Sequence, residues 1–310
     1  MELKATRYEV GGGAGGADGR FSGADGGAGG AFSGADGGFS GAGGGGSQGA
    51  VATLTLSRPH RRNAWTGRMH TELRWALEQA ERDPRVRVVV ITGEGSDFCV
   101  GADVAALAGH SERDGYDPGT DASLAMPGYG VAPQFDQNFA FMMALETVTI
   151  AAVNGAAAGV GFVLACYCDL RFASADAKLT TAHGPLGLPA EYGLSWLLPR
   201  LVGLTRANDL LLSSRKLTAA DTDGWGLFNE VVDGTALMGR VYDYAHDLAA
   251  RVAPSSLAAT KRQIYLDQHR DVGTAVAEAD RLLEEMVRGP DYREGVRALT
   301  QRRRADWPPR

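Results

Sequence analysis

Two glycine-containing segments are the parts of this chain best suited to chemistry. One holds Gly101, and the other holds Gly155, Gly159 and Gly161. Each segment follows an apolar run with the pattern of a strand and leads toward a helix. Such loops present backbone N–H groups, and the positive end of a helix dipole, to an incoming ligand. Two N–H groups aimed at one oxygen stabilise an enolate or a tetrahedral oxyanion, and each donor contributes on the order of 3 kcal/mol.

The elements that must position these loops follow from the apolar pattern. Strands are predicted over residues 4–10, 51–56, 86–92, 149–153, 170–173, 178–181 and 228–232. Helices are predicted after Thr66 and from about Val160, over residues 136–145, 194–201, 206–213 and 219–225, and repeatedly after 236. Strands that alternate with helices and then give way to helices alone predict an α/β fold with a helical C-terminal part.

Glycine is concentrated in one tract. Residues 11–50 hold 20 of the 43 glycines in the 310-residue chain. Glycine and alanine bury too little surface to offset chain entropy, so we expect a disordered low-complexity insertion in a hairpin turn. An adhesive or assembly module is the alternative, although the calcium-binding nonapeptide repeat is absent. Residues 110–133 are predicted to form a second loop, beside a pocket.

Charge and cysteine content limit the classes of partner. A net charge of −6 argues against nucleic acid. Three cysteines without a paired motif or a histidine cluster predict neither a disulfide framework nor a metal site, and favour a reducing cytoplasm. Residues 147–168 carry no charge, but the turn at Asn154 and Gly155 favours a buried strand, loop and helix over a membrane span. We therefore expect neither nucleic acid nor membrane as a partner.

Three segments together resemble the crotonase superfamily, which includes enoyl-CoA hydratases and isomerases. They read SRPHRRNA at 57–64, DFCVGADV at 97–104 and IAAVNGAAAGVG at 150–161. LPRLVG at 198–203 and DYREGVRALTQRR at 291–303 follow in the same order. The resemblance covers residues 50–305 and part of 1–10, and the glycine tract has no counterpart in it.

The resemblance implies a fold and its parts. The fold is the crotonase (ClpP-like) spiral of repeated ββα units with a helical C-terminal trimerisation part. Residues 1–10 would form the first strand, 11–50 the insertion, 51–235 the core with the acyl-CoA site, and 236–310 the oligomerisation part. The implied assembly is a homotrimer or a dimer of trimers.

The resemblance also implies the binding residues. The oxyanion donors are the backbone N–H groups of Ala102 and Val160, and Val160 replaces a glycine of the family motif. Residues expected to bind substrate or CoA are Arg61, Arg62, Asn63, Ala64, Gly101, Asp103, Gly159, Gly161 and Tyr192. Asp103 is alternatively a helix cap, and the two arginines are alternatively solvated surface residues. The basic, aromatic tail made of residues 302–304 and Trp307 either reaches a neighbouring subunit's adenine pocket or is solvated.

The acid/base groups depart from the family pattern. The two glutamates of a typical hydratase fall on Val163 and His183 in this chain, and valine cannot transfer a proton. Glu191 falls where related isomerases and a dehalogenase carry a catalytic aspartate, and His183 falls near a catalytic histidine of related hydrolases. A histidine and a carboxylate can divide acid and base roles. The alternatives are a packed loop histidine and a first-turn carboxylate of the helix near Leu194.

We therefore expect a cytoplasmic enzyme of the enoyl-CoA hydratase/isomerase type. Glu191 with His183 is the expected acid/base pair. A coenzyme A thioester is the expected substrate, with no permanently bound cofactor and no metal. Isomerisation and hydrolysis are as open as hydration. A CoA-thioester-binding protein with little catalysis is an alternative of a different class.

Overall fold

Two β-sheets organise the computed structural model, which describes residues 1–11, 50–105, 108–109 and 133–310. The larger sheet has the strand order β1-β2-β3-β5-β7-β10, with bounds Thr6–Gly11, Ala50–Leu56, Val86–Gly93, Val148–Val153, Leu170–Ser174 and Glu230–Val232. The smaller sheet has the order β4-β6-β8-β9, with bounds Asp97–Cys99, Ala156–Ala158, Lys178–Thr180 and Leu217–Thr218. From β2 to β10 the larger sheet is parallel.

The chain contributes strands to the two sheets in a repeated order. β3, β5 and β7 in the larger sheet are each followed directly by β4, β6 and β8 in the smaller one. β6 leads into α4 (Val160–Tyr167), and β8 leads through two 3-10 turns into α5 (Leu194–Ser213). The predicted ββα repetition is thus present in the chain.

Alternate residues of each central strand face opposite sides of the larger sheet. In β3, Val89 and Ile91 join the hydrophobic cluster that contains α1 (Gly67–Arg82). Val88 and Val90 join a second cluster beneath α6 (Leu237–Arg251). All eight residues of β3 are buried, which confirms the covered parallel strand predicted from the sequence.

The predicted N-terminal hairpin is confirmed. β1 pairs antiparallel with β2, and Gly11 lies opposite Val51, so both ends of the glycine tract meet at one edge of the sheet. The tract itself, residues 12–49, lies outside the described residues, as does nearly all of the loop predicted at 110–133. Buried Glu72 of α1 accepts hydrogen bonds from the backbone N–H groups of Lys4 and Ala5 at 2.8 and 2.9 Å. This carboxylate fastens the start of β1 to the helix.

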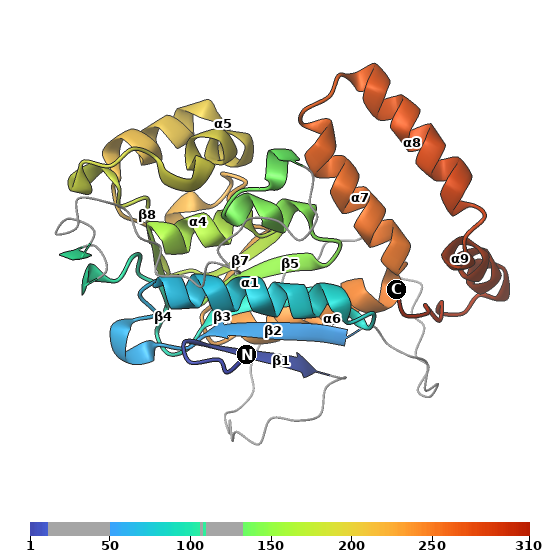
Figure 1. The fold of residues 1–310 in the computed structure, drawn as a ribbon, viewed down its shortest axis with the longest axis horizontal. Coiled ribbons are helices and arrows are strands. Elements are labelled where there is room, and N and C mark those ends of the chain that lie inside the picture. Colours follow the sequence, from blue (N-terminus) through green and yellow to red (C-terminus); the bar gives the residue numbers. More distant parts are fainter. Residues whose placement is uncertain (12–49, 106–107, 110–132) are drawn as a thin grey trace.

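The C-terminal helices form an arm beside the two sheets (Figure 1). The arm comprises α7 (Pro254–Asp267), α8 (Val272–Met286) and α9 (Pro290–Gln301). After α9 the tail folds back on its own chain, where Trp307 is buried and Arg310 donates its backbone N–H to the Pro84 carbonyl at 2.9 Å. Trp307 therefore packs on its own chain, whereas Arg302, Arg303 and Arg304 of the same predicted tail are exposed.

Several predicted helices are shorter or differently divided. Residues 136–145 and 219–225 contain only the 3-10 segments Phe139–Ala144 and Ala220–Thr222. The helices predicted at 194–201 and 206–213 lie within α5 on either side of Gly203, whose φ and ψ of 76° and 160° interrupt the helical backbone. Within the described part of the chain, no helix combines the length and apolar character needed to cross a bilayer.

Candidate active site

Three parallel strands of the smaller sheet end at one edge. β4 pairs parallel with β6, and β6 pairs parallel with β8. Because carboxyl ends of parallel strands meet, the segments that follow them also meet. These segments contain Ala102 after β4, Val160 after β6 and His183 after β8. The fold thus gathers three of the predicted site residues from positions up to 81 apart in sequence.

The two glycine loops are packed closely, and at Gly161 a side chain would not fit. A methyl group on Gly161 would lie 2.2 Å from the carbonyl oxygen of Cys99. A methyl group on Gly159 would make an ordinary contact at 3.8 Å with the Cα of Gly101, so backbone conformation rather than space favours glycine there. Gly101 and Gly159 have φ values of +101° and +49°, a region that favours glycine. The glycines therefore set the separation of the two loops.

Backbone N–H groups of both loops are available at this edge. Ala102 pairs with Trp65 as an isolated bridge, in which Gly101 O accepts from Trp65 N and Asp103 N donates to Trp65 O. In a parallel bridge the N–H of the middle residue points away from its partner, so the Ala102 N–H is directed away from Trp65. Val160 is the first residue of α4, where N–H groups have no acceptor within the helix.

Asp103 is held by its own chain. Arg58 donates to the Asp103 carboxylate at 2.9 Å and to the carbonyl of Ala64 at 2.5 Å, and the N–H of Ala105 donates to the same carboxylate at 3.0 Å. Burial raises the pKa of Asp103, but these hydrogen bonds outweigh it and hold the pKa below its usual value. The Arg58 brace was not predicted, although Arg58 belongs to the first motif. It ties the turn around Ala64 to the Ala102 loop.

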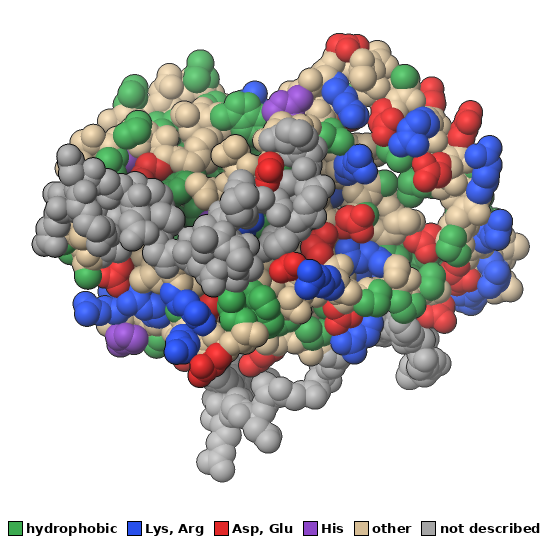
Figure 2. All heavy atoms as spheres, viewed as in Figure 1, with side chains coloured by type: hydrophobic (Ala, Val, Ile, Leu, Met, Phe, Trp, Pro, Cys, Tyr) green, Lys and Arg blue, Asp and Glu red, His purple; other side chains and the backbone are tan. Residues whose placement is uncertain are grey.

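The turn after β2 holds two arginines in different environments. Arg62 donates two hydrogen bonds to the Asp97 carboxylate, at 3.0 and 2.7 Å, and these bonds lower the pKa of Asp97. Arg61 is exposed in the same turn, where blue and purple side chains gather at the lower left of Figure 2. The buried side chain of Asn63 makes hydrogen bonds to the backbone of Arg58, Glu94 and Asp97. Any contact between Asn63 and a ligand would therefore involve its backbone.

Glu191 and His183 lie near one another. Glu191 begins the 3-10 turn Glu191–Gly193 ahead of α5, and it is half-buried. Burial raises the pKa of Glu191, and the nearby charge of His183 opposes that rise. His183 is 6% exposed and begins the turn Gly184–Leu186. A half-buried carboxylate beside a buried imidazole is an arrangement suited to proton transfer.

The chain matches a known family over most of its length. The family model described as enoyl-CoA hydratase/isomerase matches residues 46–310. The chain belongs to the enoyl-CoA hydratase/isomerase family. The 1,2-epoxyphenylacetyl-CoA isomerase of Escherichia coli is 33% identical over 82% of this chain and 93% of its own length. A probable enoyl-CoA hydratase of Mycobacterium tuberculosis is 35% identical over 69% of this chain and 73% of its own length.

Solved structures support the same family. A probable enoyl-CoA hydratase/isomerase from Mycobacterium abscessus is superimposed with a TM-score of 0.73 at 31% identity, covering 85% of this chain and 96% of the other. A putative enoyl-CoA hydratase from Streptomyces coelicolor gives a TM-score of 0.72 at 29% identity, covering 84% and 91%. The predicted crotonase fold and the predicted enzyme class are thereby confirmed.

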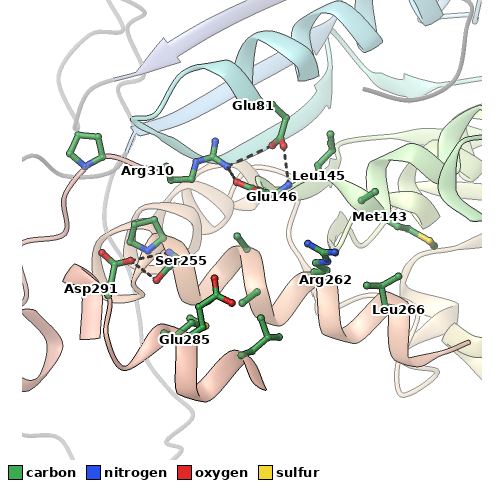
Figure 3. Close-up of a pocket in the computed structure, with 18 of the residues that line it drawn as sticks. Glu81, Met143, Leu145, Glu146, Ser255, Arg262, Leu266, Glu285, Asp291 and Arg310 are labelled. Atoms are coloured by element: carbon green, nitrogen blue, oxygen red, sulfur yellow. Dashed lines mark hydrogen bonds and ion pairs between the residues drawn. The ribbon is translucent and has the colours of Figure 1, made fainter. Parts of the chain in front are cut away.

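A cavity of about 1010 Å³ lies away from the glycine loops of this family member. It opens between the arm and the rest of the chain, and Met143, Leu145 and Leu266 are among the residues that line it (Figure 3). Arg310 lies at one side, 3.8 Å from Glu81 and 3.6 Å from Glu146. None of the residues predicted to act on substrate lines this cavity.

Proposed function

We propose that this enzyme isomerises an acyl-CoA thioester through an enolate, with Glu191 as the proton-transfer group. The observation that carries the proposal is the half-buried Glu191, which lies close enough to His183 for the charge of His183 to act on it, with His183 itself following β8 at the edge where the glycine loops lie. The substrate is the CoA thioester itself, and no resident cofactor or metal is needed for this proton transfer.

The N–H groups of Ala102 and Val160 are the proposed donors to the thioester oxygen. Their support is the geometry of the two loops, since one N–H points away from its bridge partner and the other opens a helix. The buried side chain of Val160 leaves this donor in place. An enolate oxygen bound there would be stabilised without reorganisation of the protein.

A single carboxylate favours isomerisation over hydration. Hydration requires one group to activate water and another to protonate carbon, and Val163 occupies the place of one expected glutamate. In isomerisation, the Glu191 carboxylate removes a proton from the carbon beside the thioester carbonyl. It then returns that proton to the γ carbon, two positions further from the carbonyl. The double bond thereby moves from the β,γ position to the α,β position. The relative from Escherichia coli bears the name of an isomerase that acts on a CoA ester, which supports this assignment.

Coenzyme A recognition is assigned to the turn after β2. Exposed Arg61 is the proposed phosphate partner, because the guanidinium of Arg62 is engaged by Asp97. The backbone around Asn63 and Ala64, together with the glycine loops, is the proposed pantetheine path. Asp103 supports this path through Arg58, and Tyr192 borders the acyl end next to Glu191.

A homotrimer or dimer of trimers is the proposed assembly. Helix α8 and the residue that follows it expose an apolar face made of Val272, Val276, Leu283 and Val287. At 100° per residue these four side chains fall within about 60° of arc. Exposed apolar surface of this kind is typical of contacts between subunits.

The test is Glu191→Gln assayed against a panel of acyl-CoA thioesters, with products identified by mass spectrometry. We expect kcat to fall by about 10² to 10³, because general base catalysis contributes on that order, while KM changes little. Glu230→Gln is the matched control, since Glu230 is a half-buried carboxylate paired with Arg240 at the sheet edge. Full activity of Glu191→Gln would remove Glu191 from the mechanism.

The same panel tests the binding-protein alternative. Calorimetry on the wild-type chain measures acyl-CoA binding independently of turnover. Tight binding without conversion of any thioester would favour a CoA-thioester-binding protein. Water incorporated into the product by a Glu191-dependent reaction would favour hydration, with His183 as the second group.

A further inference from the structure

We infer that Tyr167 is a positioning residue that holds the Glu191 loop in its reactive arrangement. The inference rests on the proposed function, because it concerns how Glu191 is presented to the substrate. Tyr167 is the last residue of α4, and it is absent from every motif described above. It touches Glu191 only through the following residue.

The contact is one short hydrogen bond. The buried Tyr167 hydroxyl donates to the backbone carbonyl oxygen of Tyr192 at 2.6 Å. Tyr192 directly follows Glu191, so this bond restrains the peptide between Tyr192 and Gly193, one residue beyond Glu191. Burial raises the pKa of Tyr167 to about 12, which keeps the hydroxyl protonated as a donor rather than a proton-transfer group.

The restrained turn is strained and needs such support. Tyr192 has φ 52° and ψ 31°, the left-handed region that non-glycine residues adopt at a cost on the order of 1 kcal/mol or more. Gly193 continues the turn with φ 72°, and a methyl group there would lie 2.9 Å from the Tyr167 hydroxyl oxygen. The hydroxyl therefore both bonds the turn and fills the space against it.

An aromatic contact holds the same two residues from another side. Phe139, 1% exposed, stacks on the Tyr167 ring with centroids 6.3 Å apart. Phe139 also meets the Tyr192 ring edge-on at 5.2 Å. Because Phe139 is fully packed, neither tyrosine ring can move toward it, and the hydrogen bond keeps its geometry.

Helix α4 joins this support to the other half of the site. Val160 opens the helix and Tyr167 closes it, so one rigid element carries the proposed oxyanion donor at its start and the Glu191 support at its end. Seven rises of 1.5 Å separate the two ends by about 10 Å. The helix thus fixes how far the proton-transfer group lies from the thioester oxygen, a distance on which catalysis depends strongly.

The experiment is Tyr167→Phe, which removes the hydroxyl and keeps the ring. We expect kcat to fall about tenfold with KM changed less than twofold, because binding contacts remain while Glu191 is less well oriented. The acidic limb of the kcat profile should shift to lower pH, since a loosened Glu191 is better hydrated and its pKa falls toward the ordinary value. Tyr242→Phe is the control, as it also loses one tyrosine hydrogen bond, at 2.8 Å to Thr53, on the opposite face of the larger sheet.

A double variant separates positioning from general damage. In the Glu191→Gln background, Tyr167→Phe should cost less than twofold, because the group it orients is gone. A full tenfold loss in that background would overturn the inference alone. So would a Tyr167→Phe variant with normal kcat and an unshifted pH limb while Glu191→Gln loses about 10² to 10³ in kcat. Full activity of Glu191→Gln would overturn the proposed function and this inference with it.

Discussion

The glycine loops and the C-terminal arm differ in how completely their surfaces are packed. At the loops the packing is so close that a methyl group on Gly161 would lie 2.2 Å from Cys99 O. On α8, Val272 and Leu283 are 80% and 63% exposed. The difference teaches that the glycine loops are closely packed, whereas the arm carries apolar surface that the described residues leave uncovered.

The arm is nevertheless well anchored at its base. Buried Lys261 of α7 donates to Asp169 and to the carbonyl of Thr147, both at 2.8 Å, and Tyr265 donates to the same carboxylate. Arg310 reaches back to the Val86 carbonyl at 2.9 Å. Since α7 and the C-terminal tail are both fastened to the rest of the chain, the exposed face of α8 is held in a fixed orientation.

Gly161→Ala is expected to have the largest effect on stability, because it adds a methyl group where the glycine loops are most closely packed. Neither Cys99 O nor the backbone of α4 can shift without displacing the other loop, so we expect a loss of several kcal/mol in the free energy of unfolding. Urea denaturation measures it. Gly239→Ala is the control, since that exposed α6 glycine has nothing within 4 Å of an added methyl group. It should be neutral or stabilising by up to about 1 kcal/mol. Equal stability of the two variants would contradict the close packing.

Leu283→Asp tests the other side of the comparison. A charge in the middle of the apolar α8 face should dissociate the assembly into monomers while the circular dichroism spectrum stays the same. Light scattering after size-exclusion chromatography gives the mass. Ala277→Asp adds the same charge to the same helix, about 120° around the helix axis from Leu283, and should leave the assembly intact. If both variants keep the wild-type mass, α8 is not the subunit contact.

His70→Phe is expected to have the smallest effect. It tests how burial of an ionisable side chain makes the stability of the fold depend on pH. Burial, with a smaller contribution from the charge of Arg74, lowers the pKa of His70 to about 4. The unfolded chain binds this proton near pH 6.5, so His70 weakens the fold as pH falls below 6.5. Between pH 8 and pH 5, wild type should lose about 2 kcal/mol more than His70→Phe.

The His70 measurement is the free energy of unfolding of both chains at several pH values. Carboxylates titrate equally in the two chains and cancel in the difference. Parallel curves would show that His70 is not held neutral in the folded chain. The Nε2 of His70 is buried without a hydrogen-bond partner in the described residues, between the rings of Trp65 and Phe139, which is why its charged form is disfavoured.

Local patterns predicted the parts whose cause is local. The all-apolar run at β3, the Thr66 cap that accepts from Met69 N at 3.2 Å, and the strand–loop–helix order around Gly159 are each encoded by neighbouring residues. The 3-10 segment Phe139–Ala144 was predicted as a longer helix, since its apolar residues satisfy a helical period. Packing of Phe139, Phe141 and Met142 into the core instead shapes that segment.

The sequence by itself determined the order of elements, the glycine positions and the absence of a carboxylate at 163, because these depend on residue type and spacing. Only the tertiary structure decided that Arg58 braces Asp103, that Arg62 is engaged by Asp97, and that Tyr167 meets Tyr192. Each of these contacts joins residues 25 to 45 positions apart, and their geometry follows from how the two sheets and α4 pack. Spacing along a chain cannot specify a distance across a fold, so those contacts required the structure.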